Sequence, residues 1–139
     1  MRYTIHSDGG ARGNPGPAGA GAIIHDEAGN VVATVSDYLG HQTNNFAEYE
    51  AVIRALTKLR ELIAETERGR ADVQVKMDSE LIVKQVKGEY KVKHPVLQEK
   101  RAQLARLEKA FRSISFEHVF RTQNKEADLL ANQAMDRGA

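Results

Sequence analysis

Hydrophobic and polar residues alternate along several short stretches of this chain, which is the pattern of half-buried β-strands. The first stretch covers residues 1–7, where Met1, Tyr3 and Ile5 share one side. The other predicted strands are 21–25 and 31–39, joined by a hairpin turn near 26–30, then 72–78 and 114–120. The segment 9–19 is dense in glycine and proline, so we predict a loop there.

Apolar residues spaced three and four positions apart predict four helices. The longest begins at Asn44 or Asn45 as a cap and continues to about Arg68. Its apolar stripe consists of Val52, Ala55, Leu56, Leu59 and Ile63. The others are a short helix capped by Ser79 that ends at Val86 before Gly88, a helix from Pro95 to about Arg112, and a last helix capped by Asn124.

The predicted order is strand-strand-strand-helix-strand-helix-helix-strand-helix. Three consecutive strands followed by alternating strands and helices indicate a mixed sheet covered by helices, so the predicted fold class is α/β. A length of 139 residues suits one domain, and we expect a single domain over residues 1–139.

Composition removes several classes of protein. No apolar run reaches the roughly 20 residues of a membrane-spanning helix, and no apolar stretch of a signal peptide follows Met1. We therefore expect a cytoplasmic protein with no membrane partner. The chain has no Cys, which excludes disulfides, thiolate zinc sites and cysteine nucleophiles. The glycine-rich segment has neither the phosphate-loop nor the dinucleotide-binding pattern, which argues against a nucleotide cofactor.

Charge is balanced overall and uneven along the chain. Twenty basic and nineteen acidic residues give a net charge of +1, so a global basic surface for nucleic acid is absent. Residues 84–112 nevertheless contain nine basic and three acidic side chains. This stretch fits a track for a polyanion, and it fits a solvated helix face equally well.

Four acidic residues lie at sheet ends or beside apolar stripes. Asp8 and Asp78 close two strands, and if those strands are neighbours both carboxylates project near the same sheet edge, where α/β proteins favour ligand sites. Glu48 is in line with the stripe of the long helix, and Asp128 borders the stripe of the last one.

Each acid also has a purely structural explanation. Asp8 can begin an Asp-Gly turn, and Asp78 can cap the helix that follows Ser79. Glu48 can be an acid near the helix N-terminus that the helix dipole stabilises. Asp128 can pair with Lys125 or Arg121. Together, however, desolvated acids repel one another unless cations intervene, and oxygen ligands select hard ions such as Mg²⁺ or Mn²⁺.

The chain resembles the type 1 ribonuclease H family over nearly its whole length. The matching segments, in the family's order, are DGGARGNPGP at 8–17, TNNFAE at 43–48, DS at 78–79 and NKEAD at 124–128. The resemblance implies a five-stranded mixed sheet with helices on both faces. It also implies an endonuclease that hydrolyses the RNA strand of RNA–DNA hybrids and leaves 5′-phosphate and 3′-hydroxyl ends.

The resemblance further implies that Asp8, Glu48, Asp78 and Asp128 are catalytic and hold two Mg²⁺ ions, with Mn²⁺ as a possible substitute. In this assignment Asp8 bridges both ions, Glu48 and Asp78 complete one site, and Asp128 completes the other. Two-metal hydrolysis needs no protein nucleophile.

The family also implies the substrate contacts. Asn14, Asn44 and Asn45 match positions that contact the minor groove, where 2′-hydroxyls mark the RNA strand, and Thr43 matches part of a pocket for a DNA phosphate. Helix capping is the alternative role for Asn44 and Asn45. The chain has no Trp and no room for the family's basic protrusion. Hybrid binding is therefore expected to depend on four basic side chains, Lys84, Lys87, Lys91 and Lys93.

The chain departs from the family pattern before its last acid. Many members have a His in that loop, whereas 121–126 here has none. His118 shares the parity of the apolar strand positions and is expected to be packed, so Arg121 is the candidate for part of the missing role. A non-cleaving hybrid or duplex-RNA binding module and a nuclease domain of a larger polymerase or transposon protein are the alternatives. A free-standing monomer with no obligate protein partner is the simpler expectation.

Overall fold

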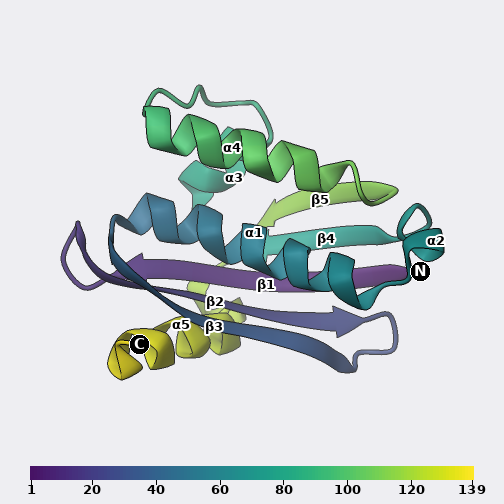
Figure 1. Ribbon diagram of the computed structural model, residues 1–139, viewed down its shortest axis with the longest axis horizontal. Helices are drawn as coiled ribbons and strands as arrows, with labels where there is room; N and C mark the ends of the chain where they lie inside the picture. Colours follow the sequence, from purple (N-terminus) through teal and green to yellow (C-terminus); the bar gives the residue numbers. More distant parts are fainter.

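A computed structural model, which describes residues 1–139, contains one five-stranded sheet with the strand order β3-β2-β1-β4-β5 (Figure 1). The strands are β1 (Arg2–Ala11), β2 (Gly16–Asp26), β3 (Val31–Gln42), β4 (Asp72–Met77) and β5 (Ser113–His118). β2 pairs antiparallel with β1 and β3, whereas β1, β4 and β5 are parallel. The predicted mixed sheet and the α/β class are therefore confirmed.

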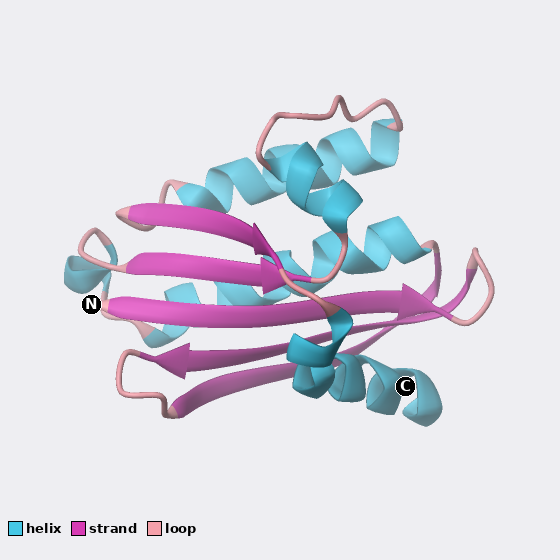
Figure 2. Ribbon diagram, turned by 180° about the vertical axis from the view of Figure 1, so that it is seen from behind, coloured by secondary structure: helices cyan, strands magenta, loops and turns pink.

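Helices lie on both faces of the sheet (Figures 1 and 2). They are α1 (Asn44–Leu62), α2 (Glu65–Arg68), α3 (Glu80–Val86), α4 (Pro95–Glu108) and α5 (Lys125–Arg137), and a single 3₁₀ turn (Arg121–Gln123) precedes α5. α1 and α4 cover one face, and α5 crosses the other face over β1, β2 and β3. None of the helices has the length and apolar character needed to cross a membrane.

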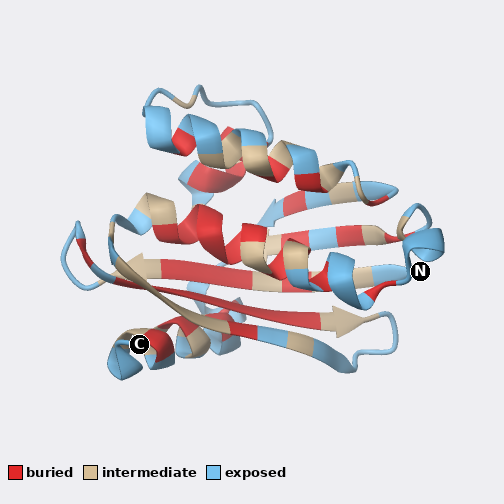
Figure 3. Cartoon of the chain, viewed as in Figure 1, coloured by how far each residue is buried: buried red, intermediate tan, exposed pale blue.

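The main core lies between the sheet and α1 (Figure 3). Val52, Leu56 and Leu59 of α1 are at most 1% exposed, as the apolar stripe predicts. The predicted extent of this helix is wrong, because α1 ends at Leu62 and α2 is a separate turn. Ile63 takes an extended conformation and turns into the core with 5% exposure, which stops the helix.

The predicted cap of α1 is also wrong, because Thr43 occupies that position instead of Asn44 or Asn45. The Phe46 amide donates to Thr43 Oγ1 at 3.1 Å. The predicted cap at Ser79 is confirmed, since its hydroxyl accepts from the Ile82 amide at 3.4 Å.

The predicted loop over 9–19 is largely strand. β1 continues to Ala11 and β2 begins at Gly16, because small residues let the two strands pair closely. A Cβ on Gly9 would collide with the backbone of Ala47 in α1, and a Cβ on Gly21 would collide with the backbone of α5. These glycines therefore serve the close approach of helices to the sheet.

The predicted helix from Pro95 to about Arg112 and the predicted strand 114–120 both begin close to their expected residues and end early. α4 stops at Glu108, and Arg112 then donates to both carboxylate oxygens of Asp72 at 3.1 and 2.9 Å. This bidentate pair connects the chain leading into β5 with the start of β4. β5 ends at His118, two residues earlier than predicted.

Candidate active site

Four acidic side chains come from four different elements. Asp8 lies toward the carboxyl end of β1, and Asp78 follows β4 directly. β1 and β4 are adjacent and parallel, with Ser7 opposite Met77, so the next residue of each strand brings the two carboxylates to one edge. This arrangement meets the condition set by the sequence argument, which required the two strands to be neighbours.

Glu48 and Asp128 reach the same place from the helices. Glu48 is in the second turn of α1, where the absence of a Cβ at Gly9 allows the helix to contact β1. Asp128 is in the first turn of α5. Its position depends on Asn124, whose side-chain Nδ2 donates to the Ser7 carbonyl at 2.8 Å and whose carbonyl accepts from the Asp128 amide at 3.1 Å.

The acids form a cluster. Carboxylate oxygens of Asp8, Glu48 and Asp78 all lie within 4.8 Å of one another. Asp128 is outside this group of three, but it lies close enough to Asp8 to raise the pKa of that carboxyl. All four line one pocket of about 340 Å³, which we call the acid pocket. The structure thus brings together every acid that the sequence singled out.

The electrostatics of the acid pocket favour a bound cation. Burial raises the pKa of Asp8 to about 8, and the charges of Asp78 and Asp128 add to this effect. Burial also raises the pKa of Glu48 well above its ordinary value, with Asp8 and Asp78 contributing. Glu48 is 9% exposed, and its Oε2 atom has no hydrogen-bond partner.

This donor set fits a hard divalent cation. The ligands are carboxylate oxygens, with no thiolate or imidazole among the four acids. A cation among them removes the mutual repulsion and gives the orphaned Glu48 oxygen a partner. The acid pocket therefore suits a metal centre and is a costly arrangement without one.

Two arginines also line the acid pocket. Arg121, the candidate for part of the missing His role, is in the 3₁₀ turn and is exposed. Arg12 was not identified from the sequence. It pairs with Asp136 at 2.6 Å and approaches Asn132 Oδ1 at 3.5 Å, which ties the turn between β1 and β2 to α5.

The prediction that His118 is packed is wrong. The ring is exposed and meets Phe120 edge-on at 6.0 Å, and Phe120 itself is 72% exposed. The alternation changes at Val119, which is 7% exposed and donates its amide to the Met77 carbonyl at 2.8 Å. β5 therefore ends at His118, whereas the predicted alternation of buried and exposed residues continued to residue 120.

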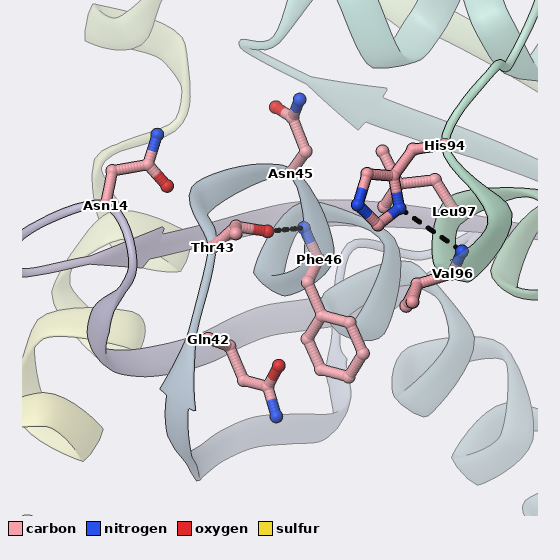
Figure 4. Close-up of a pocket in the computed structure, with 8 residues that line it drawn as sticks. All are labelled: Asn14, Gln42, Thr43, Asn45, Phe46, His94, Val96 and Leu97. Carbon is pink, nitrogen blue, oxygen red and sulfur yellow. Dashed lines mark hydrogen bonds between the residues drawn. The ribbon is translucent and has the colours of Figure 1, made fainter.

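Three of the predicted substrate contacts share a second pocket of about 290 Å³ (Figure 4). Asn14, Thr43 and Asn45 line it, and we call it the Thr43 pocket. The sequence did not single out the other lining residues, which are Gln42, Phe46, His94, Val96 and Leu97. The His94 ring accepts from the Val96 amide at 3.2 Å through Nδ1 and so caps α4 (Figure 4).

Asn44 lines the acid pocket instead. The side-chain Oδ1 of Asn44 accepts from the backbone amide of Ala11 at 2.7 Å, and the backbone amide of Asn44 donates to Asn14 Oδ1 at 3.0 Å. These bonds hold the β1–β2 turn against the start of α1, so the two pockets are connected by one rigid segment.

The four lysines lie away from both pockets. Lys84 pairs with Glu80 at 2.9 Å and lies 5.0 Å from the centre of the Tyr90 ring. Lys87, Lys91 and Lys93 are exposed in and around the connection from α3 to α4. None of the four lines the acid pocket or the Thr43 pocket.

Comparisons with known proteins agree with this geometry. A family model described as reverse transcriptase-like matches residues 6–134. The bifunctional protein Rv2228c of Mycobacterium tuberculosis is 43% identical over 140 residues, which is 100% of this chain and 37% of that protein. Ribonuclease HI of Halobacterium salinarum is 39% identical over 135 residues, covering 97% of this chain and 65% of that protein. The chain thus spans less than two thirds of the length of these relatives.

A solved structure is similar throughout its length. LC11-RNase H1, isolated from compost by a metagenomic approach, has been crystallised in complex with an RNA/DNA hybrid. It is 48% identical, superposes with a TM-score of 0.91 and covers 97% of each chain. Fold and sequence similarity therefore point in the same direction.

Proposed function

The chain belongs to the type 1 ribonuclease H family, and we propose that it is an endonuclease that hydrolyses the RNA strand of RNA–DNA hybrids. The products are 5′-phosphate and 3′-hydroxyl ends. The observation that carries this proposal is the meeting of Asp8, Glu48 and Asp78, with Asp128 beside them, in one pocket. The hybrid bound by the 48% identical LC11-RNase H1 supports the choice of substrate.

Membership of this family implies the use of divalent metal ions, and we propose two Mg²⁺ ions, with Mn²⁺ as a substitute. In this proposal Asp8, Glu48 and Asp78 would hold one ion, and Asp128 would join Asp8 in holding the other. When bound, such ions lower the pKa of a coordinated water and stabilise the leaving oxygen of the phosphodiester.

The chain's own side chains prepare the acid pocket for this reaction. Asp8 and Glu48 are at most 9% exposed, so solvent screens their charges only weakly. Asn124 holds the start of α5 against β1 and so keeps Asp128 beside Asp8. Arg121, at the edge of the pocket, places a guanidinium where it attracts the substrate phosphate and aids departure of the product.

Recognition of the hybrid is proposed for the segment between the two pockets. Amide side chains donate and accept, so Asn14, Asn44 and Asn45 suit 2′-hydroxyls and base edges in the minor groove. The hydroxyl of Thr43 accepts from the Phe46 amide, and its proton remains available for a DNA phosphate. The His94 side chain accepts at Nδ1, which leaves Nε2 available in the same pocket.

Exposed lysines supply the long-range attraction. We assign this role to Lys87, Lys91 and Lys93, which have no ion pair among the salt bridges of the structure. Lys84 contributes less, because Glu80 already neutralises it.

A matched pair of variants in α1 tests the proposal. Glu48→Gln removes a ligand from the acid pocket, whereas Glu61→Gln neutralises an exposed acid of the same helix. Each protein is incubated with hybrid labelled in the RNA strand, with Mg²⁺ or with EDTA. Cleavage by wild type and Glu61→Gln only with Mg²⁺, and none by Glu48→Gln, supports the nuclease. Binding of hybrid without cleavage by wild type would identify a non-cleaving module instead.

A further inference from the structure

A third pocket lies on the sheet face that α5 covers. It has a volume of about 260 Å³ and is formed by β1, β2 and the segment 122–126 at the start of α5. Two of the chain's five histidines, His6 and His25, line it together with Asn124 and Glu126. We call it the histidine pocket. Nothing in the proposed cleavage reaction uses it.

The strand register places the two imidazoles together. β1 and β2 are antiparallel, with His6 opposite Ile23 and Thr4 opposite His25. The two histidines are therefore diagonal neighbours on one sheet face. Their ring centres are 6.4 Å apart and their planes are nearly perpendicular, at 88°. Both side chains are partly buried, and both residues lie in paired strands, so the sheet fixes their backbone positions relative to each other.

Two buried polar side-chain atoms at this pocket have no hydrogen-bond partner. His6 Nδ1 and Asn124 Oδ1 are buried and make no hydrogen bond. Asn124 is 1% exposed, and its Nδ2 donates to the Ser7 carbonyl at 2.8 Å, which fixes which end of the amide carries the unpaired oxygen. The Asn124 oxygen is a buried acceptor and needs either a donor or a cation, and His6 Nδ1 can serve the same ligand as a lone-pair donor in one tautomer.

The donor set selects a particular class of cation. Two imidazole nitrogens with an amide oxygen and the Glu126 carboxylate suit Zn²⁺ and similar transition ions better than Mg²⁺, which prefers oxygen alone. Two imidazoles on one tetrahedral zinc, with Zn–N bonds of about 2.0–2.1 Å, have ring centres roughly 5 Å apart. The observed ring centres are 6.4 Å apart, so the two imidazoles would have to approach each other by more than 1 Å to bind one ion.

Charges around the pocket do not oppose a cation. Lys76 and Lys125 are the basic side chains near it, and Glu117 and Glu126 are the acidic ones, so their formal charges cancel. Glu126 is exposed in the first turn of α5 and is free to swing toward the histidines, since it forms no ion pair.

We propose that the histidine pocket binds one zinc-class divalent ion through His6 and His25, with Glu126 completing the site, and that the ion clamps the start of α5 onto β1 and β2. This proposal does not depend on the nuclease activity, because the ligands are different from the four acids.

The test measures metal binding by the full chain in excess Mg²⁺, which occupies the oxygen ligands of the acid pocket. Zn²⁺ is titrated by calorimetry, and Co²⁺ is followed by its visible absorption, which is strong in tetrahedral sites with nitrogen ligands and weak in octahedral oxygen sites. We expect one equivalent of Zn²⁺, strong Co²⁺ absorption and a higher melting temperature with Zn²⁺.

Three single-residue variants show which side chains bind the Zn²⁺ ion. His25→Ala, near the end of β2, should weaken Zn²⁺ binding at least tenfold, the scale on which metal sites respond even to loss of an outer partner. His41→Ala, an exposed His on β3, is the matched control and should bind as wild type does. Glu126→Gln should weaken binding without affecting folding, which covers the case in which a His variant is unstable.

Three results would overturn the proposal. Zn²⁺ binding that His25→Ala leaves unchanged would exclude the pocket, and binding lost in Asp8→Asn instead would place the ion among the acids. Stabilisation by inorganic phosphate rather than Zn²⁺, dependent on His25, would show that the pocket is an anion site.

Discussion

Replacing Asp8 by asparagine should stabilise the metal-free protein, and the gain should grow with pH. Burial and the neighbouring acids raise the pKa of Asp8 from 3.8 to about 8, so the native state holds this proton far more tightly than the unfolded chain does. The resulting destabilisation is absent below the unfolded pKa of 3.8, increases between the two values and is complete above pH 8. The asparagine side chain of the variant has no such proton to lose and escapes this cost.

The magnitude follows from proton linkage. Each unit of pH inside this window costs the wild type about 1.4 kcal/mol relative to the variant. From pH 5 to pH 8 the stability difference should therefore grow in favour of Asp8→Asn by about 4 kcal/mol. Because the side chain is 8% exposed, solvent screening reduces this figure little.

Denaturant unfolding in EDTA at several pH values measures the difference directly. Comparison of two proteins that differ at one residue cancels the titration of every distant group. Glu61→Gln, which neutralises an exposed acid of α1, is measured beside them as the control. Saturating Mg²⁺ should reverse the order, since the ion stabilises the wild type more. A constant difference across the pH range, or a variant less stable in EDTA at pH 8, would refute the electrostatic account of the acid pocket.

Two further outcomes test the substrate side. Arg121→Ala should lower the turnover number about tenfold or more while hybrid affinity changes little, measured by steady-state cleavage and binding titration; an unchanged turnover number would remove Arg121 from the reaction. Replacing Lys87, Lys91 and Lys93 together by Ala should flatten the dependence of hybrid affinity on salt, because each phosphate contact contributes a slope of roughly −0.9. A slope equal to that of wild type would show that these lysines contact no phosphate.

Much of the fold is predictable because its elements follow simple periodicities. The strand pattern before Ser7 and the apolar stripe around Leu56 each correspond to a real element. The segment 9–19 was mistaken for a loop because glycine is both a turn residue and the residue that permits close packing. Only tertiary contact, here between Gly9 and Ala47, decides between these roles.

The acids were recoverable from the sequence, whereas the residues that position them were not. A carboxylate in line with an apolar stripe is an anomaly that local reasoning detects, as with Glu48 and Asp128. Asn124 looked like an ordinary helix cap, and its actual bond to Ser7 spans 117 residues of sequence. His118 was misplaced for the converse reason, because strand parity gives no warning of where β5 ends.

The acid pocket draws its members from both ends of the fold, since Asp8 lies in the first strand and Asp128 in the final helix. During synthesis, α5 must therefore have left the ribosome before all four acids can come together. No nascent or truncated product that lacks α5 therefore carries all four acids.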